Sequence, residues 1–153
     1  MYGLAVAVPI DSLRGRVPAR PAQLSSQAKI VFDTVTQSNW EQLSDRVDAM
    51  DKAWSGLNRA SVPPRLDHQM SRAVEALKHA VGNRDTRMAR QASIDVGHAG
   101  LDLRLQYEPQ AEIDRARLGL WDDQVALDRG AGDSGAVAGD RATIRAIEDR
   151  IRP

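Results

Sequence analysis

The sequence contains no cysteine, and this absence removes several kinds of chemistry at once. Disulfide bonds, thiolate catalysis, cysteine-based zinc sites and iron–sulfur clusters all require the missing residue. Aromatic residues make up only 4% of the chain, so aliphatic side chains and alanine must form most of any core. The 153 residues can bury about 70% of their unfolded surface, which permits one domain without covalent staples.

An excess of charge of either sign is also missing. The 21 Lys and Arg residues and the 21 Asp and Glu residues are interleaved and leave no net charge. Nucleic acid requires clustered cationic groups that neutralise its phosphates, so we expect no nucleic-acid partner. Long apolar runs are absent as well. The run Leu4–Val8 is too short to span a bilayer, and the sequence therefore predicts no integral membrane span.

The first 21 residues differ from the rest of the chain in composition. Three prolines and three arginines follow the short apolar run, and no basic segment of the kind that opens a signal peptide precedes it. We interpret residues 1–21 either as a tail or as the remnant of an export or anchor segment. The second interpretation favours an extracytoplasmic location over a cytoplasmic one. We expect residues 22–153 to form a single helical-bundle domain.

Three segments of this domain share one pattern, in which a helix, a short polar turn and a second helix follow each other. Asn39, Asp85 and Asp133 suit the N-cap position of the second helix and lie 46 and 48 residues apart. Such a period is typical of stacked αα-hairpins, each of which needs its neighbours to bury its apolar face. We therefore predict an all-α antiparallel bundle of about six helices in three αα-hairpins. Turns are expected near residues 37–39, 83–85 and 131–133, with more than two-thirds of the chain helical and no sheet.

The spacing of apolar residues supports these helices. The clearest stripe advances in steps of three and four residues, as on one face of a helix: Trp40, Leu43, Val47, Met50, Trp54 and Leu57. The predicted helix at residues 85–107 is apolar on two opposite faces, which is typical of a helix packed between others. One face carries Met88, Ala92, Val96, Ala99 and Leu103, and the other carries Ile94, Leu101 and Leu105.

The segment Gly130–Gly135 matches the pattern GxGxxG, which in dinucleotide-binding proteins follows a β-strand. A helix is predicted before this segment, so we interpret it as the third hairpin turn. The histidine motifs of zinc proteases and of di-iron bundles are absent from the sequence. We therefore predict neither a catalytic residue nor a bound cofactor from motifs.

The three histidines are the candidate metal ligands. A tight turn at residues 82–84 places His68 level with His98 and His79 level with Met88, and Asp95 lies one turn before His98. The set His68, His98 and Asp95 suits zinc or another divalent transition metal, and His79 with Met88 suits copper. Two simpler interpretations remain open. His68 and His79 lie away from the apolar stripe of their helix and are solvated, and His98 is a hydrogen-bonded core residue.

Residues 100–133, GLDLRLQYEPQAEIDRARLGLWDDQVALDRGAGD, resemble a segment of small all-helical bacterial proteins of uncharacterised function. These proteins are often actinobacterial and often exported. The similarity lies in the Leu-x-Leu-x-Tyr-x-Pro junction at Leu103–Pro109 and in Leu120-Trp121 followed by the turn at Gly132-Asp133. These are packing and turn features. The resemblance implies an all-helical fold and an envelope location, and it implies no functional residue.

The sequence supports two functional hypotheses. The leading one is a non-enzymatic helical-hairpin protein that acts as a protein-interaction or assembly module, with another protein or a second copy of itself as the partner. The alternative is an extracytoplasmic metal-binding or metal-handling protein that uses His68 and His98 of one hairpin.

Overall fold

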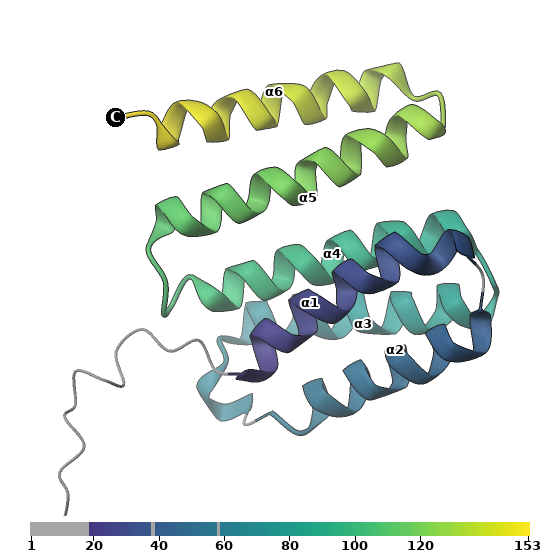
Figure 1. Ribbon diagram of the computed structural model, residues 1–153. Helices are drawn as coiled ribbons and strands as arrows, with labels where there is room; N and C mark the ends of the chain where they lie inside the picture. The colour runs from purple at the N-terminus through teal and green to yellow at the C-terminus, as the bar shows by residue number, and fades with distance from the viewer. Residues whose placement is uncertain (1–18, 38, 58) are drawn as a thin grey trace, which may run out of the picture.

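The computed structural model describes residues 19–37, 39–57 and 59–153, which form six α-helices (Figure 1). The helices are α1 (Ala19–Thr34), α2 (Trp40–Ser55), α3 (Pro64–Gly82), α4 (Thr86–Arg104), α5 (Gln110–Gly130) and α6 (Ser134–Ile151). Two short 3-10 helices, η2 (Val35–Gln37) and η3 (Arg59–Ser61), lie before α2 and α3. Helices account for 86% of the described residues, which contain no strand. The predicted all-α helical bundle is therefore confirmed.

The helix boundaries follow from capping and proline chemistry. Each of the three predicted N-caps accepts a hydrogen bond from the backbone N–H three residues further on: Asn39 from Gln42 at 3.1 Å, Asp85 from Met88 at 3.0 Å and Asp133 from Ala136 at 2.9 Å. Gly132 has a φ of +72°, a conformation in which glycine is unstrained, so Gly130–Gly135 forms the predicted hairpin turn. Helix α1 begins at Ala19, three residues before the predicted start, because Pro21 fits the first turn of a helix. Residues 1–18 of the predicted tail or export remnant lie outside the described residues.

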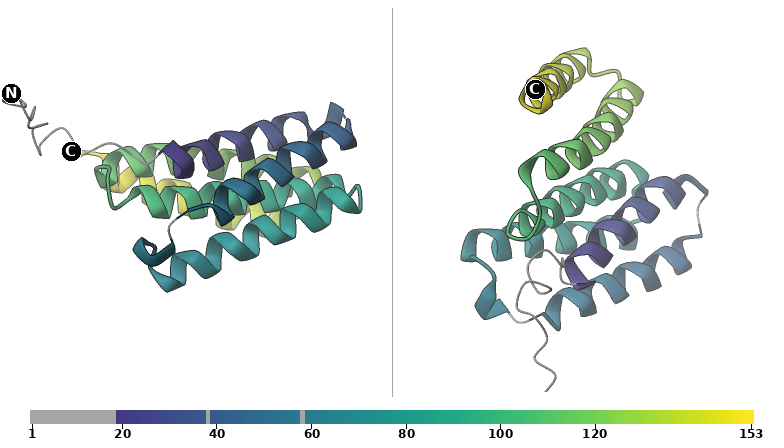
Figure 2. Two further views of the ribbon diagram at one scale, coloured as in Figure 1. Left: turned by 90° about the horizontal axis from the view of Figure 1, so that it is seen from below. Right: turned by 60° about the vertical axis from the view of Figure 1, so that its left-hand side comes forward.

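The first four helices form a four-helix bundle in which each helix packs on the next and α1 packs on α4 (Figure 2). The predicted stripe of α2 lies in this core: Leu43, Val47, Met50 and Trp54 are buried, and Trp40 and Leu57 at its ends are partly buried. The buried cluster that contains this stripe has Trp54 as its one aromatic member among the described residues, in keeping with the low aromatic content. Within the described residues, no helix has the length and apolar character needed to cross a membrane.

Helix α4 lies between the other helices of the bundle and α5, as its two apolar faces predict. Ala92, Val96, Ala99 and Leu103 are buried on the bundle side, and Ile94 and Leu101 are buried as well. The prediction was wrong for two residues at the ends of the helix: Met88 is 55% exposed and Leu105 is 39% exposed. Met88 lies in the first turn of α4, and Leu105 is the C-cap residue, so each lies at an end of the helix.

Helices α5 and α6 extend the layer beyond α4, and α6 packs chiefly on α5 (Figures 1 and 2). Few apolar side chains are fully buried here: Ile113 and Leu127 of α5, and Ile147 of α6. Polar groups supply much of the contact between the two helices. Arg150 of α6 donates to both carboxylate oxygens of the buried Asp114 of α5, at 2.9 and 3.3 Å.

A second polar contact between α5 and α6 joins two buried carboxyl groups. Asp128 and Asp140 are 9% and 7% exposed, and Oδ2 of Asp140 has no hydrogen-bond partner. Gln124 Nε2 donates to both oxygens of Asp128, and Gln91 of α4 in turn bonds Gln124. Burial, a hydrogen bond to Asp128 and the negative charges of Asp128 and Asp133 raise the pKa of Asp140 to about 6. The pair therefore holds a proton in acid and loses it near neutrality.

We expect Trp54→Ala to lower the free energy of unfolding by about 3–5 kcal/mol, the range for emptying a buried aromatic site. Trp54 is 1% exposed, and its Nε1 donates to Ser71 Oγ of α3 at 2.9 Å. Trp40→Ala is the matched control, because Trp40 is only partly buried and its loss should cost less. Urea unfolding of both variants measures the difference. Equal losses, or a Trp54→Ala variant nearly as stable as the parent, would show that Trp54 does not anchor the core.

Stability should also depend on the proton of the Asp128–Asp140 pair. Because folding raises the pKa of Asp140 to about 6, the stabilising contribution of the protonated Asp128–Asp140 pair to the free energy of unfolding is fully present below about pH 4. It is lost as pH rises through about 6. At pH 7.5 we expect Asp140→Asn to melt about 2–4 °C above the parent, the shift for about 1 kcal/mol in a chain of this size.

The same comparison at pH 5 should give a smaller difference, because the parent then retains most of its proton. Asp149→Asn, an exposed substitution on the same helix, controls for the general effect of removing a carboxylate. Thermal unfolding followed by circular dichroism measures all three proteins. A difference between the parent and Asp140→Asn that is the same at both pH values would refute the proposed role of the proton.

Candidate functional site

The predicted metal ligands His68, Asp95 and His98 line one hollow of about 550 Å³ between α3 and α4. Arg65 and Arg72 of α3 line the same hollow. The hairpin turn thus brings the three residues to one surface, as expected from their level positions. Within the part of the chain that the structure describes, however, no three His, Cys, Asp or Glu side chains are grouped to hold a metal ion.

His98 is half-buried because its ring packs against Trp121 of α5, with 5.3 Å between the ring centroids and an interplanar angle of 54°. Burial lowers the pKa of His98, and the positive charge of Arg117 lowers it further, while Asp102 has the opposite effect. Burial raises the pKa of the Asp95 carboxyl, and a hydrogen bond from Gln91 opposes this. His98 is therefore held neutral against an aromatic ring, and His68 is exposed.

The second predicted pair, His79 and Met88, has other roles in the structure. His79 lies in the last turn of α3, where Asn83 Nδ2 donates to its Nε2 at 3.0 Å. The side chain of Met88, which carries the sulfur atom Sδ, lies at the start of α4 and is largely exposed. The positions of His79 and Met88 along α3 and α4 are compatible with the observed hairpin. The side chain of His79 contacts the end of its own helix, and the side chain of Met88 lies on the solvent-facing surface.

A further concave surface is a groove of about 700 Å³ between α1 and α5, with α4 as its floor. We call it the α1–α5 groove, and its lining is mostly apolar. The groove is lined by Ser25, Ser26, Lys29, Ile30, Gly97, Leu101, Arg104, Ala116, Gly119, Leu120, Asp122 and Asp123. None of these residues was predicted from the sequence to belong to a functional site.

Small residues give the α1–α5 groove its depth. Leu120 of α5 reaches α4 at Gly97, where an added Cβ would lie 2.8 Å from Leu120 Cδ2. Gly119 has no side chain on the α5 side of the groove, and nothing lies within 4 Å of the position that a Cβ would occupy there. The α5 wall is therefore low at this point. The lining residues of α4 extend over the eight residues from Gly97 to Arg104, about 10 Å of helix. This length matches two turns of a helix.

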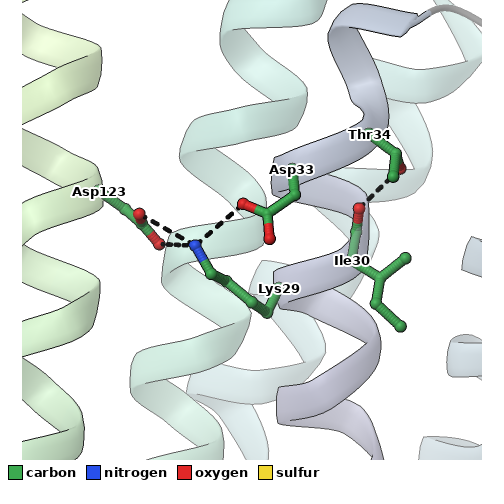
Figure 3. A network of polar contacts seen from close by, with 5 residues as sticks. All are labelled: Lys29, Ile30, Asp33, Thr34 and Asp123. Carbon is green, nitrogen blue, oxygen red and sulfur yellow. Dashed lines mark hydrogen bonds and ion pairs between the residues drawn. The ribbon is translucent and has the colours of Figure 1, made fainter.

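Lys29 connects the two sides of the groove (Figure 3). Its ammonium lies between Asp33 of α1 and Asp123 of α5, with 2.9 Å from Nζ to the nearest oxygen of each carboxylate. Partial burial lowers the pKa of Lys29, but the two carboxylates outweigh this and raise it, so the ion pair persists across the neutral range. The ion pair therefore joins α1 to α5, two helices that both pack on α4.

The end of the groove at Lys29 is acidic. Asp33, Asp122 and Asp123 supply three carboxylates there. Lys29 supplies one positive charge, and Arg90, whose guanidinium lies 5.2 Å from the Phe32 ring that Lys29 also faces, supplies a second nearby, so the carboxylates still outnumber the cations by one. Asp122 is exposed and forms no ion pair with any other described residue. Arg104 at the other end is neutralised by Glu108, which accepts from its Nε and Nη2. The groove thus has one charged end and one neutral end.

These features define the protein as an all-α antiparallel helical bundle with an open, mostly apolar groove between two of its helices. Comparison of the chain with models of protein families, with curated proteins and with solved structures finds no match. The resemblance of residues 100–133 to exported bacterial helical proteins stays a prediction.

The open space at Gly119 leads to a stability prediction. Gly119→Ala should raise the free energy of unfolding by about 0.5–1 kcal/mol, because alanine restricts the unfolded chain and nothing blocks its methyl group. Gly139→Ala in α6 is the matched control and should stabilise equally, since its site is also open. Urea unfolding tests both. A destabilising Gly119→Ala would mean that the groove is filled in solution.

Proposed function

We propose that this protein is a non-enzymatic helical-hairpin module that binds a helix of another protein in the α1–α5 groove. The observation that carries the proposal is the groove itself, which is mostly apolar, about 700 Å³ in volume and open to solvent. Amphipathic helices bind in grooves of this kind by placing an apolar stripe against the floor. The small residues Ala116 and Gly119 of α5 allow such a helix to approach closely.

The scaffold around the groove also supports this function. Its floor belongs to α4, whose residues are largely buried, so the floor is rigid. The α5 wall is fixed to α4 at Gly97 and Leu120 and to α1 by the Lys29 ion pair. A groove with fixed walls binds at a lower entropic cost than one that must first be formed.

A display library of amphipathic helical peptides tests the proposal. Peptides selected on the parent protein should bind Gly139→Gln equally well and should bind Gly119→Gln at least about tenfold more weakly, a loss of about 1.4 kcal/mol. The glutamine at position 119 projects into the groove, and both substitutions place it in open space, so both variants should fold. Selected peptides that bind the two variants equally, or a library without binders, would contradict the proposal.

Metal binding at the hollow between α3 and α4 is the second candidate function. One observation favours it, the convergence of His68, Asp95 and His98 on that hollow. We place it second because Arg65 and Arg72 line the hollow too, and their positive charge opposes a bound cation. Calorimetric titration with zinc decides the matter. Stoichiometric binding by the parent that is lost in His68→Ala and His98→Ala would support metal handling, and the absence of binding would remove it.

A further inference from the structure

The charge at one end of the α1–α5 groove indicates which helices it accepts. We propose that the groove selects a cationic amphipathic helix, with the apolar stripe of the partner on the groove floor and a Lys or Arg of the partner at Asp122 and Asp123. This inference rests on the proposed function and adds the chemistry of the partner to it.

The first step of the argument is the distribution of charge. Asp33 and Asp123 share the ammonium of Lys29. Arg90, whose guanidinium lies 5.2 Å from the Phe32 ring that Lys29 also faces, is the second cation nearby. Asp122 adds a third carboxylate on the same end of α5 and forms no ion pair among the described residues. A cation arriving at this end completes the charge balance, whereas an anion meets repulsion from three carboxylates.

The second step concerns the apolar part of the groove. Ala116 and Leu120 lie four residues apart on α5, about one helical turn, beside Leu101 of α4, and Asp122 and Asp123 follow within the next turn at the Lys29 end. A partner helix that places apolar residues at positions i and i+4 on this strip reaches Asp122 within its next turn. Its cationic residue is therefore expected about one turn beyond the apolar stripe. The acidic residues at the Lys29 end therefore determine which end of the partner helix lies near Asp122.

The opposite end supports the same direction. Arg104 and Glu108 form a two-bond ion pair there, so this end offers no free charge to either terminus of a partner. The net charge of the whole chain is zero, so the preference for a cation comes from the local group and is not a general attraction. The selectivity is therefore expected to depend on Asp122, and an exposed aspartate elsewhere should not contribute to it.

Two synthetic helical peptides of about 18 residues provide the test. They share one apolar face of Leu and Ala and carry either Lys or Glu at the position one turn beyond it. We expect the Lys peptide to bind the parent about tenfold more tightly than the Glu peptide, as measured by fluorescence anisotropy at low salt. Asp122→Asn should reduce this ratio to about threefold or less. Asp48→Asn, an exposed aspartate on α2, should leave the ratio unchanged.

The outcomes separate this inference from the proposed function. Equal binding of both peptides, lost in Gly119→Gln, would overturn the charge selectivity and keep the groove as the docking site. Peptide binding unaffected by Gly119→Gln would overturn both. Sedimentation of the parent as a dimer that Gly119→Gln alone dissociates would show that a second copy occupies the groove, and it would overturn the cationic partner. A tenfold preference for Lys that depends on Asp122 and on an open groove supports the inference.

Discussion

The two apolar faces of α4 are the constraint on which the rest of the structure depends. Val96 and Leu103 face the core of the four-helix bundle, and Ile94 packs with Phe32 of α1 and Leu127 of α5. Leaving either face in water would cost about 25 cal/mol for each Å² of apolar surface. Helix α4 therefore requires both the bundle and α5. The α5–α6 hairpin, which has few buried apolar residues of its own, is in turn held in place by α4.

The α1–α5 groove is a consequence of this arrangement. Helices α1 and α5 both pack on α4, and they are joined across it by the Lys29–Asp123 ion pair. An exposed ion pair of this kind contributes little to stability, about 0–1 kcal/mol, so its main effect is on the position of the α5 wall. The remaining space is lined by small residues such as Ala116 and Gly119, and the open position at Gly119 leaves room for the side chains of a partner. The packing of α1 and α5 on α4 thus produces both the fold and the proposed binding groove.

The elements of the fold could be predicted from the sequence because their signals are local. Asn39, Asp85 and Asp133 mark helix starts by their own side-chain chemistry, and the stripe from Trp40 to Leu57 shows which face of α2 is buried. Periodicity failed at Met88, because a stripe does not show where the neighbouring helices end. The groove was not predicted at all. Its walls come from α1 and α5, and the contact between Lys29 and Asp123 spans 94 residues, a distance over which a single sequence carries no pairing signal. The small residues at Gly97 and Gly119 were the one available sign of close approach and open space.

Helix α4 is the centre of the molecule, and α6 is its least secured helix. Native-state hydrogen exchange, followed residue by residue, tests this most directly. We expect buried amides of α4 to exchange only when the whole molecule unfolds. We expect amides of α6 to exchange through a smaller opening that leaves α1 to α4 protected. Equal protection of α4 and α6, or exchange of α4 before α6, would contradict this expectation.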